Sequence, residues 1–99
     1  MEKTPFKFKI VNAQLDGMKL KTVVDFGYGW KEQIIELEDG TTETVYNGNI
    51  VRETIELPFL MTAQQVQDYL LAYWSNKYGA LDTYYQTLND LESLKGLTM

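Results

Sequence analysis

Carboxylates are the main side chains left in this sequence for acid–base or metal chemistry. The 99-residue chain has 14 aspartates and glutamates, no histidine and no cysteine. Histidine is the usual general base and a common metal ligand, and cysteine supplies thiolate nucleophiles, disulfides and the sulfur ligands of zinc. We therefore expect no disulfide, no Cys/His zinc site and no nucleophile–histidine pair.

The most acidic short segment contains Glu36, Glu38 and Asp39. It lacks the Asp-x-Asp-x-Asp-Gly spacing and the closing glutamate of a calcium loop, so no metal site is predicted. A hydrolase that uses two carboxylates needs a deep cleft and a neighbour that raises the pKa of one acid. A domain of this size leaves little room for such a cleft. The three acids are candidates for contact with a protein.

Strand pairing offers a structural explanation for the same acids. A turn near Tyr28 would place Lys21 opposite Glu36. It would also place Lys19 opposite Glu38. Cross-strand ion pairs of this kind help to specify the register of a hairpin. The acidic segment is then a solvated hairpin end.

The segment Gly27-Tyr28-Gly29-Trp30 is too short a motif for nucleotide binding. It has no third glycine and no Gly-Lys-Ser/Thr, and a strand-like sequence follows it instead of a helix. We interpret it as a loop or turn, because glycine permits unusual backbone angles. We predict no catalytic, cofactor-binding or metal-ligating residue, expect no cofactor and do not expect an enzyme.

Aromatic residues are the more informative candidates. Six tyrosines and tryptophans lie within residues 69–85, and Trp30 directly follows the glycine-rich segment. Part of this cluster belongs to a helical core stripe, while exposed tyrosine and tryptophan are favoured anchors at protein interfaces. Both interpretations stay open. The candidate anchors are Tyr73, Trp74, Tyr78, Tyr84, Tyr85 and Trp30.

Alternating apolar and polar residues predict the strands that would position these side chains. The alternation covers residues 6–11, 18–26, 31–38, 41–46 and 51–57. Turn residues separate the runs, including Asp16-Gly17, Asp39-Gly40 and Asn47-Gly48, and Pro58 ends the last one. The predicted inward-facing residues are Phe6, Phe8, Ile10, Leu20, Val24, Phe26, Ile35, Leu37, Val51, Ile55 and Leu57.

The pattern changes to helical spacing after Pro58. Thr62 and Gln65 form a capping box that begins one helix, and Gly79 suits its C-terminal cap. The chain is expected to be a single α+β domain over residues 1–99. In it, an antiparallel five-stranded β-meander at about 5–57 precedes two helices at about 63–78 and 80–95, which pack on one sheet face.

Charge is unevenly distributed along the chain, although the net charge is only −5. Residues 1–31 carry six lysines against three acids, and residues 32–57 carry seven acids against Arg52 alone. A single arginine makes nucleic-acid binding unlikely, because arginine is the main reader of bases and phosphates. No apolar run is long enough for a signal peptide or a membrane span. We expect a cytoplasmic protein, or one built into a virion in the cytoplasm.

Two functional hypotheses follow. The first is a small non-enzymatic structural or assembly module that docks into a larger, homomeric complex, and the composition suggests a phage or mobile-element protein. The positive and negative segments could meet between copies. The alternative is an acidic inhibitor or regulator that binds a basic cleft of a host protein, as an anti-defence protein or nucleic-acid mimic. Both imply a protein partner and no membrane.

Overall fold

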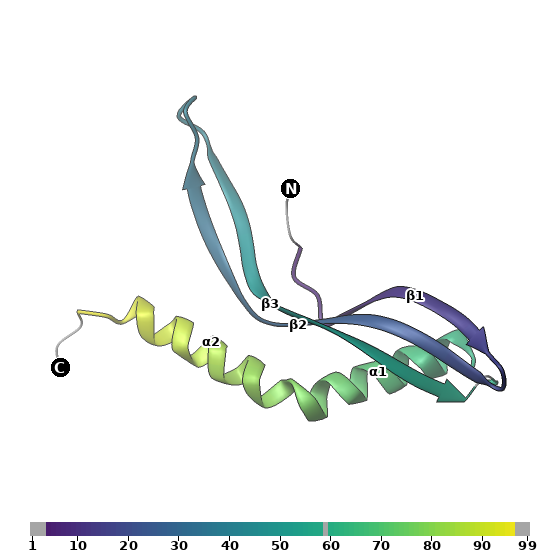
Figure 1. The fold of residues 1–99 in the computed structure, drawn as a ribbon. Helices are drawn as coiled ribbons and strands as arrows, with labels where there is room; N and C mark the ends of the chain where they lie inside the picture. The colour runs from purple at the N-terminus through teal and green to yellow at the C-terminus, as the bar shows by residue number, and fades with distance from the viewer. Residues whose placement is uncertain (1–3, 59, 97–99) are drawn as a thin grey trace.

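The chain has the α+β class but three strands, not the five that the sequence pattern predicts. The computed structural model describes residues 4–58 and 60–96. The elements are β1 (Phe8–Asp16), β2 (Lys19–Glu36), β3 (Thr42–Pro58), α1 (Ala63–Lys77) and α2 (Gly79–Ser93). The three strands form an antiparallel sheet in the order β1-β2-β3 (Figure 1).

The glycine-rich segment does not turn the chain but lies inside β2. The register between β2 and β3 runs from Lys19 opposite Pro58 to Glu36 opposite Thr42, with one irregularity between Tyr28 and Lys31. Gly29, which has a φ of 67°, supplies the left-handed backbone of this irregularity. The expected second and third strands are therefore one strand that bends at a bulge.

The predicted turn at Asn47-Gly48 is also wrong, because Gly48 serves a side-chain contact inside β3. A Cβ on Gly48 would lie 2.5 Å from Cδ2 of Trp30, and a Cβ on Gly27 would lie 2.8 Å from Cζ2 of the same indole. Both glycines thus make room for Trp30 against the backbone of two neighbouring strands. The expected fourth and fifth strands are the two halves of β3.

Two other turns are confirmed. The link from β1 to β2 passes through Gly17, at a φ of 65°, and the link from β2 to β3 passes through Gly40, at a φ of 86°. Asp39 stabilises the second turn, because its Oδ1 accepts the Thr41 N–H at 3.0 Å and the Thr41 hydroxyl at 2.6 Å. These turns depend on adjacent residues only.

The core lies between one face of the sheet and α1. Thr62 and Gln65 form the predicted capping box at the start of this helix. Only part of the predicted inward face is covered, since Ile35 and Leu37 are each 40% exposed. The buried core residues are Val24, Phe26, Ile55, Leu57, Val66, Leu70, Trp74 and Tyr78.

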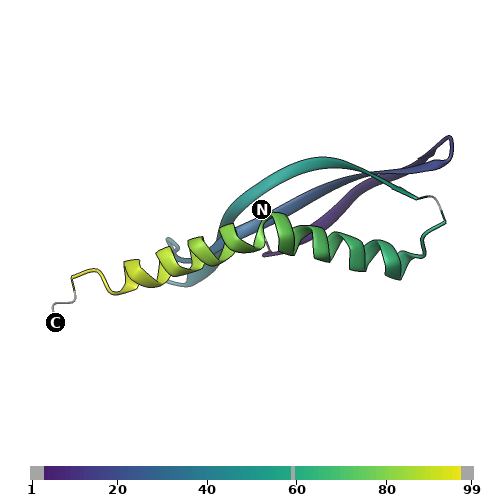
Figure 2. The same ribbon diagram turned by 90° about the horizontal axis from the view of Figure 1, so that it is seen from below.

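The helix α2 does not cover the sheet, contrary to the prediction for both helices. Gly79 is the first residue of α2 and not a helix cap, and Tyr78 alone separates the two helices. Figure 2 shows α2 continuing beyond the end of α1. It packs against β2 at the bulge, and none of its residues is fully buried.

The molecule is elongated. Its principal extents are 58, 39 and 19 Å, and its Cα radius of gyration is 17.9 Å. A compact domain of this length has a radius of gyration of about 13 Å. The excess comes from α2 and from the hairpin of residues 31–47, hereafter the arm, which project from the sheet in different directions (Figure 1). Neither helix of the described chain is long and apolar enough to span a bilayer.

The buried hydroxyl of Thr22 generates the first prediction. Thr22 is 1% exposed, and its Oγ1 has no hydrogen-bond partner among the described residues. The Thr22→Val variant keeps the shape and removes an unpaired polar group, so we expect it to raise the free energy of unfolding by about 1 kcal/mol. Urea and thermal unfolding measure the change. The exposed Thr54→Val serves as control and should change little, and a Thr22→Val variant that is no more stable than wild type contradicts the prediction.

Candidate interaction surfaces

The structure separates the aromatic candidates into buried and exposed residues. Trp74 and Tyr78 are core residues, and Tyr73 stacks on Phe26 with a centroid distance of 5.2 Å. Trp30 and Tyr85 are half-buried at the bend of β2. Tyr84 is the most accessible of the six, with 62% of its surface exposed. Helical spacing alone could not separate the tyrosines and the tryptophan of residues 73–85, because it does not show which apolar positions the chain itself covers.

A hydrogen-bonded cluster centred on Glu53 joins β3 to α1. Oε1 of Glu53 accepts the Tyr73 hydroxyl at 2.9 Å and the Lys77 ammonium at 2.7 Å, and Oε2 accepts the Tyr78 hydroxyl. Burial raises the pKa of Glu53, but the hydrogen bonds from Lys77, Tyr78 and Tyr73 outweigh it and leave the pKa below its ordinary value.

The same cluster is poorly suited to proton transfer. Burial, and then the hydrogen bond to Glu53, raises the pKa of Tyr78 to about 12. The hydrogen bond to Glu53 also raises the pKa of Lys77. A general acid or base works best with a pKa near the working pH, and all three groups move away from neutrality. The cluster therefore fastens α1 to the sheet.

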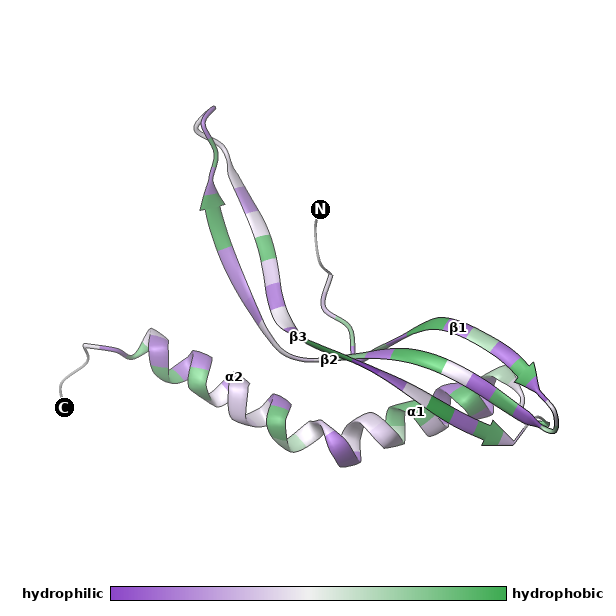
Figure 3. Cartoon of the chain, in the orientation of Figure 1, coloured by the Kyte–Doolittle hydropathy of each residue, from purple (hydrophilic) through white to green (hydrophobic). Residues whose placement is uncertain are grey.

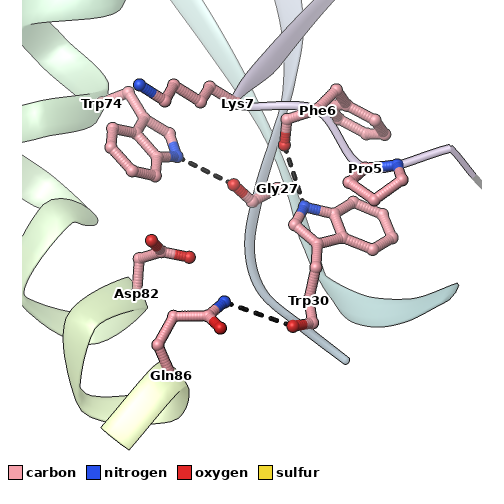
Figure 4. A pocket seen from close by; sticks show the side chains of 8 residues that line it. All are labelled: Pro5, Phe6, Lys7, Gly27, Trp30, Trp74, Asp82 and Gln86. Atoms are coloured by element: carbon pink, nitrogen blue, oxygen red, sulfur yellow. Dashed lines mark hydrogen bonds between the residues drawn. The ribbon is translucent and has the colours of Figure 1, made fainter. Parts of the chain in front are cut away.

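The bend of β2 carries most of the contacts between α2 and the rest of the chain. Oδ1 of Asp82 accepts the Gly29 N–H at 2.9 Å, and the side-chain amide of Gln86 donates to the Trp30 carbonyl at 3.2 Å. The Trp30 indole N–H donates to the Phe6 carbonyl at 2.9 Å. We call this cluster around Trp30 the junction, and Figure 4 shows part of it.

A cavity of about 430 Å³ opens beside the junction. Both indole N–H groups that reach it already donate to main-chain carbonyls, Trp30 to Phe6 and Trp74 to Gly27. Lys7 lies over the Trp74 ring, 5.0 Å from its centroid. The described residues contain no group of three acids that could hold a metal ion. The cavity is lined by Pro5, Phe6, Lys7, Gly27, Trp30, Trp74, Asp82 and Gln86 (Figure 4).

The structure places the acidic candidates at the outer end of the arm. Glu36 and Glu38 are exposed, and Asp39 caps the turn. The predicted ion pairs with Lys21 and Lys19 do not form, because β2 is continuous and these lysines lie at its opposite end. Lys19 binds Glu56 at 3.1 Å, and Lys21 lies 3.7 Å from Asp16. Residues 32–47 contain five acids and no lysine or arginine, so the arm is acidic.

The arm also has free strand edges. The register of β1 with β2 extends only from Phe8–Asp16 to residues 19–26, so no third strand borders the arm among the described residues. Its two faces carry apolar side chains, and Ile34 is 67% exposed. Free edges and exposed β-branched residues together make a surface to which another strand can add.

Comparison of the chain with models of protein families, with curated proteins and with solved structures gives no match. The functional argument therefore rests on the surfaces just described.

The Glu53 cluster predicts a pH-dependent contribution to stability. A carboxyl whose pKa is lowered by folding stabilises the fold above its unfolded pKa, and this contribution disappears as the pH falls through the folded value. We expect Glu53→Gln to lower the free energy of unfolding by about 2 kcal/mol at pH 7, through loss of charged hydrogen bonds. The difference from wild type should shrink below about pH 4.5.

Chemical denaturation at several pH values measures this difference. The matched control is Glu36→Gln, since Glu36 makes no side-chain hydrogen bond or ion pair within the described chain, and it should leave stability unchanged at every pH. A difference between Glu53→Gln and wild type that persists in acid would contradict the proposed role of the charge.

The packing at the junction predicts that a single methyl group added at Gly48 destabilises the fold. Gly48→Ala places a Cβ against the Trp30 indole, so the ring or the strand has to move, and we expect a loss of about 1–3 kcal/mol of stability. Thermal unfolding and the emission spectrum of tryptophan report both changes. In the control Gly79→Ala, the new Cβ meets nothing within 4 Å. Equal effects of the two substitutions would show that Trp30 does not need the space at Gly48.

Proposed function

We propose that this chain is a non-enzymatic structural module that joins a larger, homomeric assembly through its arm. The single observation that carries the proposal is the arm itself, a long hairpin whose outer edges pair with no third strand of the described chain and whose residues Ile34, Ile35 and Leu37 are exposed. A cytoplasmically assembled virion of a phage or mobile element is the kind of complex that we propose, on composition alone.

The low stability expected of an isolated hairpin supports this interpretation of the arm. A two-stranded hairpin is at best marginally stable in water, and a long free edge invites association with other strands. The arm nevertheless contains strand-forming residues, including Ile34, Ile35 and Val45, although these side chains add little to the stability of a monomer. A neighbouring copy that pairs with an edge would complete the hydrogen bonds and cover these side chains.

The surroundings of Glu53 support a non-enzymatic role. Within the described residues, the carboxylate richest in contacts, Glu53, is held by three donors and faces the core. The proposal includes no cofactor and no nucleic-acid partner.

A second candidate function has one specific observation in its favour. The five acids of residues 32–47 have no lysine or arginine beside them in that segment, and they lie on the arm, which projects away from α1 (Figure 1). Such an arm could enter a basic cleft of another protein and act as an inhibitor or regulator. This function requires a chain that does not form large assemblies and a complex that weakens steeply as salt rises.

The test compares two exposed apolar residues in different places. Ile34 on the arm is 67% exposed and Leu15 at the far end of the sheet is 69% exposed. We expect wild type to form species larger than a dimer as its concentration rises, with little dependence on salt. Ile34→Thr should weaken this association about tenfold, because it removes apolar area from the contact. Leu15→Thr, the control, should not.

Sedimentation velocity measures the size distribution of all three proteins, and circular dichroism verifies their folding. Wild type that never exceeds a dimer would contradict the proposal, as would equal effects of the two substitutions. Binding of wild type to a basic protein that is abolished by salt would favour the inhibitor instead.

A further inference from the structure

The helix α2 turns a polar face toward its own chain. Asp82 accepts a main-chain N–H of β2, Gln86 and Asn89 donate to the Trp30 carbonyl, and Glu92 pairs with Lys31. A surface helix normally packs its apolar stripe inward and exposes its polar side. The arrangement in α2 departs from this rule, which raises the question of where its apolar side chains lie.

Apart from Tyr85, whose ring centroid lies 5.8 Å from that of Tyr28, the large apolar side chains of α2 lie on a different face and are open to solvent. Leu81, Tyr84, Leu88 and Leu91 follow one another at intervals of three, four and three residues, which is the seam spacing of paired helices. Their exposed fractions range from 40% for Leu88 to 62% for Tyr84. Figure 3 shows several hydrophobic bands, coloured green, along α2. We call these four residues the seam.

The residues beside the seam carry no charge on the side that faces away from β2. That row consists of Ala80, Thr87 and Leu94, and Leu94 is itself 52% exposed. In two helices packed on this seam, the row of one copy lies next to the row of the other. Like charges would oppose such self-pairing, and this row contains none.

We propose that the seam of α2 binds the seam of a second copy of this chain, with the two helices antiparallel. This arrangement sets Leu81 level with Leu91 of the other copy, and Tyr84 level with its Leu88. The helix α1 and the part of the sheet that it covers lie at the N-terminal end of α2 (Figures 1 and 2). Antiparallel packing keeps the two sheets apart and also aligns the helix dipoles favourably.

The exposed area is consistent with a weak dimer. The seam and Leu94 together expose about 500 Å² of mostly apolar surface, as much as the largest patch on a typical monomer. Two copies would bury about 1,000 Å² in total, which is the lower limit for a specific interface. We therefore expect a dissociation constant in the micromolar range.

The first experiment replaces one seam residue. Wild type should show a reversible monomer–dimer step by sedimentation equilibrium, at concentrations below those at which larger species form, and Leu88→Glu should weaken this step by at least about a hundredfold, because a symmetric dimer loses the residue twice. Tyr84→Glu, at a more exposed position, should do the same if Leu88→Glu folds poorly. Thr83→Glu, which places the charge away from the seam, is the control and should dimerise like wild type.

The second experiment tests the direction of the helices. The chain has no cysteine, so an introduced one is the only thiol. In the antiparallel dimer, residues 81 of the two copies are about 15 Å apart along the axis, which is beyond disulfide reach. Leu81→Cys alone and Leu91→Cys alone should then fail to cross-link, and an equal mixture should cross-link readily. Cross-linking of Leu81→Cys with itself would overturn the antiparallel arrangement.

The inference rests on α2 and not on the arm, so the two proposals fail separately. A wild-type monomer at all concentrations, or a Leu88→Glu variant that dimerises normally, overturns the helix dimer. If Leu88→Glu is monomeric but Ile34→Thr has no effect on wild-type association, the arm proposal fails and the helix dimer stands.

Discussion

The contact between the Trp30 indole and the backbones of Gly27 and Gly48 determines how the rest of the molecule is arranged. The ring lies across two neighbouring strands at the bulge in β2, where any side chain on either glycine would collide with it. The same stretch of β2 anchors α2 through Asp82, Gln86 and Asn89. The direction of the arm and the placement of α2 are thus set at one point. Without the contacts at this bulge, the folded part of the molecule would be only a small sheet covered by α1.

This arrangement leaves the chain with surfaces that it does not cover itself. The core between the sheet and α1 is closed, and the Glu53 cluster fastens it at one edge. Beyond the junction, the arm has free edges and the seam of α2 faces solvent. The acids that the arm carries keep it hydrated, while Ile34 and its apolar neighbours favour a covered state. These two surfaces are the ones through which we propose that the chain associates with other copies.

Local signals predict the parts of the fold that depend on adjacent residues. Asp39-Gly40 makes a turn in which the Asp39 side chain accepts the Thr41 N–H, only two residues along the chain. Thr62 caps α1 by accepting the N–H of Gln65, three residues along the chain. Gly48 gives the same local signal as a turn glycine, but its role is set by Trp30, which lies eighteen residues earlier in the sequence. The spacing of Leu81, Tyr84, Leu88 and Leu91 correctly indicates an amphipathic helix. It cannot indicate whether the apolar face meets the chain's own sheet or a partner, because polar contacts made by Asp82 and Gln86 decide the orientation.

The central claim is that other copies of the chain cover the arm. Hydrogen–deuterium exchange, followed by mass spectrometry at low and at high protein concentration, tests this claim most directly, because an edge amide exchanges slowly only when another strand accepts its hydrogen bond. We predict that the amides of residues 31–47 become protected as the concentration rises, while those of the sheet beside α1 stay unchanged. Rapid exchange along the arm at every concentration would contradict the account.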